Sequence, residues 1–397
     1  MEPVKIFLKS GKEKSVKRRH LWIFSGAISK IEGKPDEGDI VSVFDFENNF
    51  LAKGHYQSDS ITIRILTFEN IEINTNFWNE KLSDAINQRK ICSLYDLKDT
   101  NVFRLVNGEG DLLSGLIIDF YNGVAVMQCH SIGMYKNRIE IAKELKKIMG
   151  NKLTAVYDKS AYTLPRKINE KPVNQFLIGE SPEEIEIIEN NYKFIINIAT
   201  GQKTGFFIDQ RENRNLIKKY SKNRTILNMF AYTGGFSVYA LGSGALYVDS
   251  IDSSSKGMEI TDKNIRLNNF TNNHKSITSD VNKYFDKINE TNKKYDLIIL
   301  DPPAFAKHKK DLNHALKAYK KLNEKAIRII EKKGIIFTFS CSQVVSKNDF
   351  RKAIFVAAAT TGRKVKILHQ LSQPQDHPIS VYHPEGEYLK GLVLLVD

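Results

Sequence analysis

The sequence predicts an α/β protein in which a doubly wound, largely parallel sheet follows a small β-barrel and a mixed α+β segment. From residue 189 onward, strand-like runs alternate with helix-like stretches, which is typical of a doubly wound sheet. In the first seventy residues, short apolar runs are separated by glycine and polar turns, which is typical of a small barrel. A chain of 397 residues is also too long for one ordinary core. We therefore expect three domains, at residues 1–72, 73–188 and 189–397.

Composition excludes several classes of protein. A hydrophobic content of 41% with 26% charged residues is typical of soluble globular proteins. The sequence lacks an 18-residue apolar run and an apolar signal core, so a membrane or secreted protein is not expected. The three cysteines, Cys92, Cys129 and Cys341, are odd in number and widely spaced. They argue against a disulfide framework or a zinc site, and we expect a cytoplasmic protein without a metal.

The first domain, residues 1–72, is predicted to contain strands at residues 5–10, 38–45, 50–56 and 61–66. The net charge of the chain is +13, and residues 9–19 contain six basic residues and one acid. Such a cluster is typical of a nucleic-acid interface, although a solvated face is an alternative. The predicted RNA-binding residues are Lys12, Lys14, Lys17, Arg18 and Arg19.

Aromatic residues lie beside this basic segment. His20, Trp22 and Phe24 have two interpretations, stacking on unpaired bases or filling the barrel. We favour the second, because small barrels need bulky interiors.

The second domain, residues 73–188, begins with a predicted helix over residues 76–94, which places Phe77, Leu82, Ile86 and Ile91 on one face. Tyr121-Asn122-Gly123 between apolar runs predicts a hairpin. A helix around residues 135–148 and a strand near residues 153–159 follow. The acidic stretch at residues 179–190 is interpreted as a linker to the third domain.

In the third domain, residues 189–397, strands are expected at residues 225–230, 245–252, 276–281, 295–301 and 334–340. Helices are expected at residues 253–269 and 311–333. The first strand leads into a turn containing Gly234 and Gly235, and the second ends in Asp252, 18 residues after Gly234. That spacing resembles the distance to a ribose-binding acid in nucleotide-binding sheets.

Two more acids follow later strands, Asp280 and Asp301, and strand ends of this kind line the ligand crevice. A structural alternative is that Asp252 and Asp280 only cap the following helices. The turn is T-G-G-F rather than G-x-G-x-x-G and no Walker lysine follows, so a pyrophosphate cradle is poorly supported. An adenosine with an uncharged or cationic tail fits the acidic crevice better, and S-adenosylmethionine is the leading candidate.

The longer patterns resemble the class I S-adenosylmethionine-dependent methyltransferases with a Rossmann-like sheet. More closely, they resemble the bacterial 23S ribosomal RNA cytosine-C5 methyltransferases that carry an N-terminal PUA domain. The resemblance rests on RRHLWIFSGAI and EGDIVSVFD in the first domain and on RLVNGEGDLLSGLIIDFY in the second. In the third it rests on TGQKTGFFIDQREN, LNMFAYTGGFSVYA, LDPPAFAK and FSCSQVVSKNDF.

The resemblance implies a set of site residues. Asp252 would hold the ribose, Asp280 the adenine amino group, and Asp301 would face the target base. The cofactor-binding positions implied are Lys203, Gln210, Arg211, Asn228, Phe230, Tyr232, Thr233, Gly234, Asp252, Ser253, Asp280, Val281, Asp301 and Pro302.

Cys341 follows a predicted strand and is either core filler, as most free cysteines are, or a nucleophile. Cytosine C5 does not accept a methyl group unaided, but a thiolate added at C6 makes C5 enamine-like, and an acid near N3 stabilises the adduct. Within FSCSQ and beside Asp301-Pro302-Pro303, we favour the nucleophile. Cys92 and Cys129 keep the core interpretation. The product-releasing second cysteine of some RNA cytosine-C5 methyltransferases is missing here, because Ala304 follows Pro303.

Other functions stay open. Asp-Pro-Pro with an aromatic residue close behind it, Phe305, is similar to the amine-methyltransferase signature, so methylation of a guanine nitrogen in RNA is the main alternative. A non-catalytic RNA-binding ribosome assembly factor is another, and a dehydrogenase a third. The expected partner is RNA, either 23S ribosomal RNA or a large-subunit assembly intermediate, and a homodimer is left open.

Overall fold

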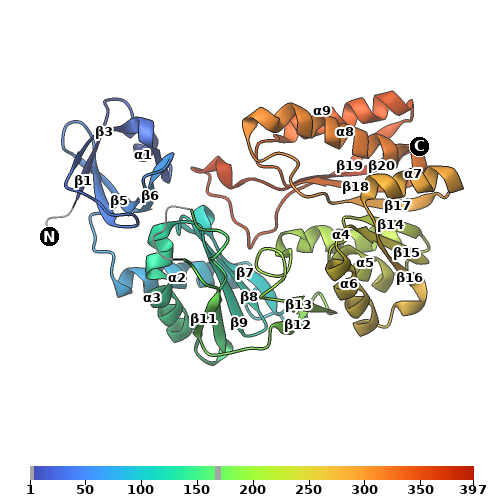
Figure 1. The fold of residues 1–397 in the computed structure, drawn as a ribbon, viewed down its shortest axis with the longest axis horizontal. Helices are drawn as coiled ribbons and strands as arrows, with labels where there is room; N and C mark the ends of the chain where they lie inside the picture. The colour runs from blue at the N-terminus through green and yellow to red at the C-terminus, as the bar shows by residue number, and fades with distance from the viewer. Residues whose placement is uncertain (1–3, 166–170) are drawn as a thin grey trace. The chain divides into compact units, whose positions relative to one another are not determined.

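The computed structural model describes residues 4–165 and 171–397, which form two compact units (Figure 1). Unit 1 comprises Met1–Ile187, Asn197–Ile208 and Gln375–Gly386. Unit 2 comprises Ile188–Ile196, Asp209–Pro374 and Glu387–Asp397. The division into domains at residues 1–72, 73–188 and 189–397 stays a prediction.

The N-terminal part of unit 1 is a six-stranded sheet within the described residues, in the order β2-β6-β5-β4-β1-β3. Its elements are β1 (Lys5–Leu8), α1 (Glu13–Lys17), β2 (Trp22–Phe24), β3 (Ile28–Glu32), β4 (Ile40–Phe44), β5 (Phe50–Tyr56) and β6 (Ile61–Thr67). Buried side chains such as Ile6, Val43 and Ile63 form one core. The four expected strands are present. Strands β2 and β3 were not expected, because β2 has three residues and β3 is largely exposed and lacks an apolar alternation.

The second part of unit 1 is a sheet in the order β11-β10-β9-β8-β7 with two long helices. Its elements are α2 (Thr75–Ile91), β7 (Val102–Asn107), β8 (Leu116–Tyr121), β9 (Val124–Cys129), α3 (Ile132–Met149), β10 (Ala155–Asp158) and β11 (Gln175–Ile178). The expected hairpin is confirmed, since Asn122 and Gly123 take φ of 44° and 96° between β8 and β9. Ile91 was wrongly placed on the buried face of α2: it is 83% exposed at the helix end, and Trp78 and Arg89 are buried instead.

The stretch at residues 179–190 is not a linker. It contains β12 (Glu184–Glu189), which forms a two-stranded sheet with β13 (Tyr192–Asn197). Asn190 and Asn191 take φ of 49° and 67° in the turn. Glu189 is buried because both its carboxylate oxygens accept hydrogen bonds from Arg214, each at 2.8 Å. A high acid content concealed a strand whose alternate residues are buried.

Unit 2 contains a seven-stranded sheet within the described chain, in the order β16-β15-β14-β17-β18-β20-β19. Its strands are β14 (Thr225–Met229), β15 (Tyr247–Asp252), β16 (His274–Thr278), β17 (Tyr295–Leu300), β18 (Ile330–Ser340), β19 (Val365–Leu371) and β20 (Lys390–Val396). The first five are parallel, and β20 is antiparallel to both of its neighbours. The predicted doubly wound, largely parallel sheet is therefore confirmed.

The helices of unit 2 cover both faces of this sheet (Figure 1). They are α4 (Arg211–Ser221), α5 (Gly235–Gly242), α6 (Ser255–Leu267), α7 (Val281–Thr291), α8 (Leu312–Ile329) and α9 (Lys347–Thr361). Helices α7, α8 and α9 share one hydrophobic core with the sheet, and α4, α5 and α6 lie on the other face. The carboxyl ends of β14, β15, β17 and β18 lie along one edge, where doubly wound sheets bind ligands.

Candidate active site

The turn after β14 has an unusual backbone. Phe230 and Tyr232 take φ of 61° and 51°, a region that side chains other than glycine rarely adopt, and Gly234 takes φ of 78°. Hydrogen bonds hold the turn: the Tyr232 N–H donates to Asp252 Oδ2 (2.9 Å), and Thr261 Oγ1 donates to the Tyr232 carbonyl (3.0 Å). Bulky residues in this region often occur at functional sites, where surrounding contacts maintain the strain.

Two asparagines fix the polar groups of the same turn. Asn228 is buried at the end of β14 and its Nδ2 donates to Ser237 Oγ (2.8 Å). Its Oδ1 is also buried and has no hydrogen-bond partner among the described residues. Asn264 Nδ2 donates to the Thr233 carbonyl (2.9 Å). Asn228 Oδ1 is therefore a buried acceptor for which a bound ligand would supply the donor.

The two acids that follow β15 and β16 differ. Asp252 does not cap the next helix, because Ser254 is the N-cap of α6. The Oδ1 atom of Asp252 accepts from the Ser254 N–H (2.9 Å), and its Oδ2 accepts from the Tyr232 N–H. The Asp252 carboxylate therefore connects the ends of β14 and β15. Asp280 does cap α7, since its Oδ1 accepts from two backbone N–H groups. Of the residues after them, Ser253 is exposed and Val281 is buried in the core.

The residues before α4 reach the end of β17. Gln210 Nε2 donates to Asp301 Oδ1 (3.1 Å), and its Oε1 accepts from Asn213 (2.6 Å). Arg211 is buried, with Nε 3.4 Å from Glu212 Oε1. Lys203 belongs to unit 1, where its side chain is exposed.

Asp301 directly follows β17 and lies in an acidic, shielded environment. Burial and the Asp209 carboxylate raise the pKa of Asp301 to about 7, against the opposing effects of Gln210 and Arg214. Asp209 Oδ2 accepts from the Tyr388 hydroxyl (2.7 Å), whereas its buried Oδ1 has no partner among the described residues. Asp301 is thus a carboxyl group that can hold or release a proton near neutral pH.

Cys341 directly follows β18, the strand paired with β17, and is half-buried. Its Sγ lies 3.8 Å from the carbonyl oxygen of Pro302. Burial and the charges of Asp301 and Asp209 raise the pKa of the Cys341 thiol to about 12, and Lys390 acts in the opposite direction. The structure therefore brings together the strand-end cysteine and the strand-end aspartate that the sequence indicated.

Three residues of this site were not predicted from the sequence, namely Lys390, Asp209 and Tyr388. Lys390 begins β20 opposite Ser340 and is buried, and its Nζ donates to the Ser342 carbonyl (2.7 Å). Burial lowers the pKa of Lys390 to about 8, although Cys341 and Glu387 act to raise it. A lysine at the start of the apolar stretch KGLVLLV was the available signal for this residue.

The basic segment of the N-terminal sheet lies on and after α1. Lys12, Lys14, Lys17, Arg18 and Arg19 are all exposed. Lys17 Nζ is 3.4 Å from Asp45 Oδ2, and the Arg19 guanidinium lies 4.7 Å from the ring centre of Phe68.

The aromatic residues beside this segment differ in their surroundings. Trp22 packs against the core of the sheet, in agreement with the barrel-filling interpretation, and its Nε1 donates to Glu109 Oε1 (2.9 Å). Phe24 is 45% exposed, so the barrel-filling interpretation is wrong for this residue. Among the residues that the structure describes, none of the helices is long and apolar enough to cross a membrane.

Comparison with known proteins identifies the family of this chain. The family described as S-adenosylmethionine-dependent methyltransferase matches residues 104–376, and the PUA-like domain matches residues 6–68. A protein of Tolumonas auensis named ribosomal RNA large subunit methyltransferase I is 39% identical, with 98% of each chain covered. The protein of the same name from Alteromonas mediterranea is 37% identical, again with 98% of each chain covered.

Solved structures show the same fold. A methyltransferase crystallised in complex with SAH superposes with a TM-score of 0.86 at 25% identity, covering 99% of this chain and 100% of the other. The M. jannaschii tRNA m1G37 methyltransferase superposes with a TM-score of 0.51 at 20% identity, covering 91% and 92%. This second likeness shows the fold alone. The chain belongs to the S-adenosylmethionine-dependent methyltransferases and, within them, to the ribosomal RNA large subunit methyltransferase I family.

Proposed function

We propose that this protein methylates C5 of a cytosine in large-subunit ribosomal RNA through a transient bond between Cys341 and cytosine C6. The observation that carries the proposal is the position of Cys341 and Asp301 at the ends of neighbouring parallel strands, with Sγ 3.8 Å from the Pro302 carbonyl. Relatives that match the whole chain are named for methylation of large-subunit ribosomal RNA, which supports the substrate class.

The edge of the sheet fits S-adenosylmethionine, which supplies an electrophilic methyl group. Asn228 Oδ1 is a buried acceptor without a partner among the described residues. A donor group of the bound ligand would form the missing hydrogen bond. The turn lies close against Thr261 of α6, and Gly234 has no side chain that would collide with it. We assign the cofactor to this turn together with Asp252 and Asp280. The remaining predicted contacts are Lys203, Gln210, Arg211, Phe230, Tyr232, Thr233, Ser253, Val281, Asp301 and Pro302.

The reaction steps assigned to the chain's own residues begin with deprotonation of Cys341. The Cys341 thiol gives its proton to water, and Sγ forms a bond to C6 of cytosine. The electrons of the C5–C6 double bond move toward N3, where the protonated Asp301 carboxyl donates a proton. C5 then carries the electron density needed to accept the methyl group. Loss of the C5 proton, departure of the sulfur from C6 as the thiolate, and return of the N3 proton to the Asp301 carboxylate restore the ring and both side chains. The base that removes the C5 proton is left unassigned.

The surroundings of Cys341 control the first step. Two carboxyl groups disfavour the thiolate, and the buried Lys390 ammonium favours it. When Asp301 carries its proton, one of the two opposing charges disappears. The same proton that Asp301 donates to N3 therefore also favours thiolate formation, which couples the two groups.

The amine-methyltransferase alternative receives less support. The amine-methyltransferase signature uses an aromatic residue directly after Asp-Pro-Pro for stacking, whereas Ala304 holds that position in this chain. Here Phe305 packs on Tyr319, with ring centres 4.7 Å apart, and contacts the hydrophobic core. A non-catalytic assembly factor would have no need of a thiol beside a carboxyl group of raised pKa.

RNA is the proposed partner. The exposed basic residues Lys12, Lys14, Lys17, Arg18 and Arg19 are proposed to contact phosphates of 23S ribosomal RNA or of a large-subunit assembly intermediate. The match to the PUA-like domain over residues 6–68 supports an RNA role for this part of the chain. A homodimer stays a prediction, which analytical ultracentrifugation would check.

Nucleoside mass spectrometry tests the proposed function. Purified protein, S-adenosylmethionine and unmodified large-subunit RNA should yield 5-methylcytosine. Ribosomal RNA from a strain lacking the protein should lose this modification at one position, and the cloned gene should restore it. Appearance of a methylated guanine instead would replace the proposal with the amine alternative, and no methylated nucleoside on either naked RNA or subunits would favour the assembly factor.

Replacing Gly234 with alanine should weaken cofactor binding by about tenfold or more. An alanine Cβ would lie 2.7 Å from Thr261 Cγ2, and the φ of 78° adds about 1–2 kcal/mol of strain. The measurement is titration calorimetry with S-adenosylmethionine. Gly244→Ala is the matched control, because Gly244 has φ of 86° and its Cβ would meet nothing closer than 3.6 Å. Equal affinity of both variants for S-adenosylmethionine would show that the turn after β14 is not part of the cofactor site.

A further inference from the structure

Three metal-ligating side chains from opposite ends of the chain meet in unit 1. They are His20, just before β2, and His383 and Glu385 in the segment Gln375–Gly386. One ligand atom of each lies within 4.8 Å of the others. His20 Nε2 is 3.3 Å from both carboxylate oxygens of Glu385, and His383 Nδ1 is 3.7 Å from Glu385 Oε2.

These separations fit ligands around a metal better than they fit direct ion pairs. A charge-assisted N–H···O bond is about 2.7–2.9 Å long, shorter than every one of them. Two ligands at about 2.0–2.1 Å from a tetrahedral zinc ion are about 3.3 Å apart. The two pairs that include Glu385 are therefore close to the spacing of metal ligands, and the two histidine nitrogens lie within 4.8 Å of each other.

A second observation is independent of the spacing. His383 is only 1% exposed, and its Nδ1 has no hydrogen-bond partner among the described residues. Buried ring nitrogens are almost always paired, because an unmet one costs about 1–3 kcal/mol. A cation at the centre of the cluster would satisfy this nitrogen.

The remaining contacts orient the cluster. His20 Nδ1 lies 3.1 Å from the Trp22 carbonyl oxygen. The Trp22 N–H lies 3.2 Å from the same nitrogen, so the two contacts correspond to two tautomers of His20. The tautomer with the proton on Nδ1 directs the Nε2 lone pair at the cluster, and it is the one that a bound metal would select. The His383 ring packs edge-on against Trp22, with ring centres 4.4 Å apart. The Glu109 carboxylate accepts hydrogen bonds from Trp22 Nε1 and Ser114 Oγ and adds negative charge near His383.

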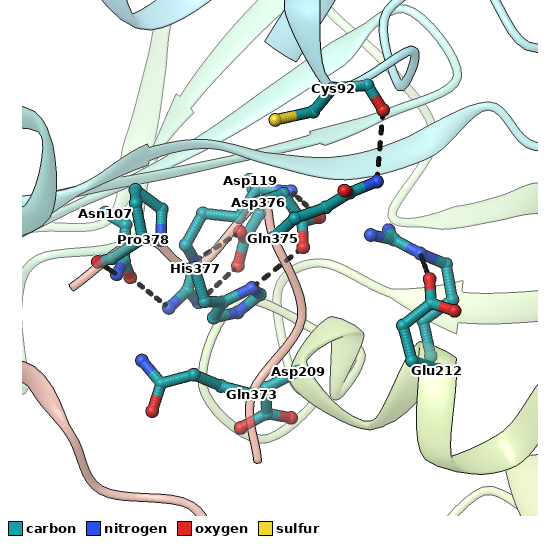
Figure 2. A network of polar contacts seen from close by, with 12 residues as sticks. Cys92, Asn107, Asp119, Asp209, Glu212, Gln373, Gln375, Asp376, His377 and Pro378 are labelled. Carbon is teal, nitrogen blue, oxygen red and sulfur yellow. Dashed lines mark hydrogen bonds and ion pairs between the residues drawn. The ribbon is translucent and has the colours of Figure 1, made fainter. Parts of the chain in front are cut away.

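The segment that supplies two of the ligands is firmly held in unit 1. Figure 2 shows Gln375 donating to the Cys92 carbonyl (3.0 Å) and Asn107 donating to the Pro378 carbonyl (3.0 Å). Asp376 Oδ2 accepts from the Arg104 N–H (3.0 Å). These contacts fix the start of the segment. The turn that carries the ligands is closed by hydrogen bonds from the His383 N–H to the Ser380 carbonyl (2.9 Å) and from the Gly386 N–H to the His383 carbonyl (3.2 Å).

We propose that His20, His383 and Glu385 bind a divalent transition-metal ion of the zinc class, with water at the fourth position. Two imidazoles and one carboxylate match the ligands that zinc uses when one position stays open. The ion would tie the segment Gln375–Gly386 to the N-terminal sheet. The proposal is independent of the reaction assigned to Cys341.

Titration of the metal-stripped full-length protein with zinc tests the proposal. Wild type should bind one equivalent saturably, and cobalt should give the visible absorption of a tetrahedral site. Glu385→Gln, which changes a partly exposed side chain without loss of volume, should weaken zinc binding at least tenfold, as should His383→Ala. His314→Ala is the control, since His314 is exposed on α8 and distant in sequence from the cluster, and it should bind zinc like wild type. Failure of wild type to take up zinc, or equal affinity in all variants, would overturn the proposal.

Discussion

Replacing Cys341 with alanine should lower methyl transfer to RNA by on the order of 10³-fold or more, while the affinity for S-adenosylmethionine stays unchanged. The loss follows because C5 of cytosine gains nucleophilic character only after sulfur adds at C6. Cofactor binding should persist because the Sγ contact is with the Pro302 carbonyl, whereas the β14 turn is held by Asp252 and Thr261. Single-turnover methylation assays and calorimetry measure the two quantities.

Cys92→Ala is the matched control. Cys92 belongs to unit 1 and contributes its backbone carbonyl, which the substitution retains, to Gln375. This variant should methylate RNA at the wild-type rate. Normal turnover by Cys341→Ala would show that sulfur takes no part in the reaction.

Replacing Asp301 with asparagine should lower turnover by about 10²–10⁴-fold, the usual contribution of a general acid. Asparagine keeps the shape and the contact with Gln210, but it has no proton to transfer to N3. Asp286→Asn, at an exposed position on α7, is the control and should be fully active. An active Asp301→Asn variant would exclude Asp301 as the acid.

The pH dependence separates the roles of the two groups. With pKa values of about 7 for Asp301 and about 12 for Cys341, kcat/KM of wild type should rise with pH below 7. Above 7 it should level off, since loss of the Asp301 proton offsets the gain in thiolate. In Asp301→Asn, kcat/KM should continue to rise above pH 7, because the loss of an Asp301 proton no longer offsets the gain in thiolate. A plateau in both proteins would contradict the assignment.

Stability should move in the opposite direction from activity. The pKa of Asp301 is raised in the folded protein from 3.8 to about 7, so its contribution to stability is fully present below the lower value and is lost as the pH rises through the higher one. The asparagine side chain of the Asp301→Asn variant cannot ionise and escapes this loss. The melting temperature of that variant at alkaline pH should therefore equal or exceed that of wild type, which distinguishes lost chemistry from lost folding.

The parallel sheet and its edge were predictable because they depend on local patterns. Strands such as β14 and β17 are apolar runs, and the chain then has to turn at Gly234 or at Asp301-Pro302. Parallel strand ends meet at one edge, so acids and a cysteine placed there are brought together by topology alone. Cys341 beside Pro302 is the clearest case.

What the sequence did not reveal depends on pairing between distant segments. Lys390 lies near Cys341 only because β20 inserts antiparallel between β18 and β19. Glu189 is buried because Arg214, 25 residues further on, neutralises it. His20 and His383 come from opposite ends of the chain, and a search for metal sites based on cysteines could not find them. Asp209 lies within a recognised motif, but its role near Asp301 depends on the fold.

Covalent trapping tests the central claim most directly. RNA containing 5-fluorocytosine at the methylated position blocks the last step, because fluorine cannot leave C5 as a proton does. Incubation with wild-type protein and S-adenosylmethionine should give a stable protein–RNA complex, and peptide mapping should place the link at Cys341. A wild-type enzyme that methylates normal RNA yet forms no such complex, or forms one at another residue, would contradict the account.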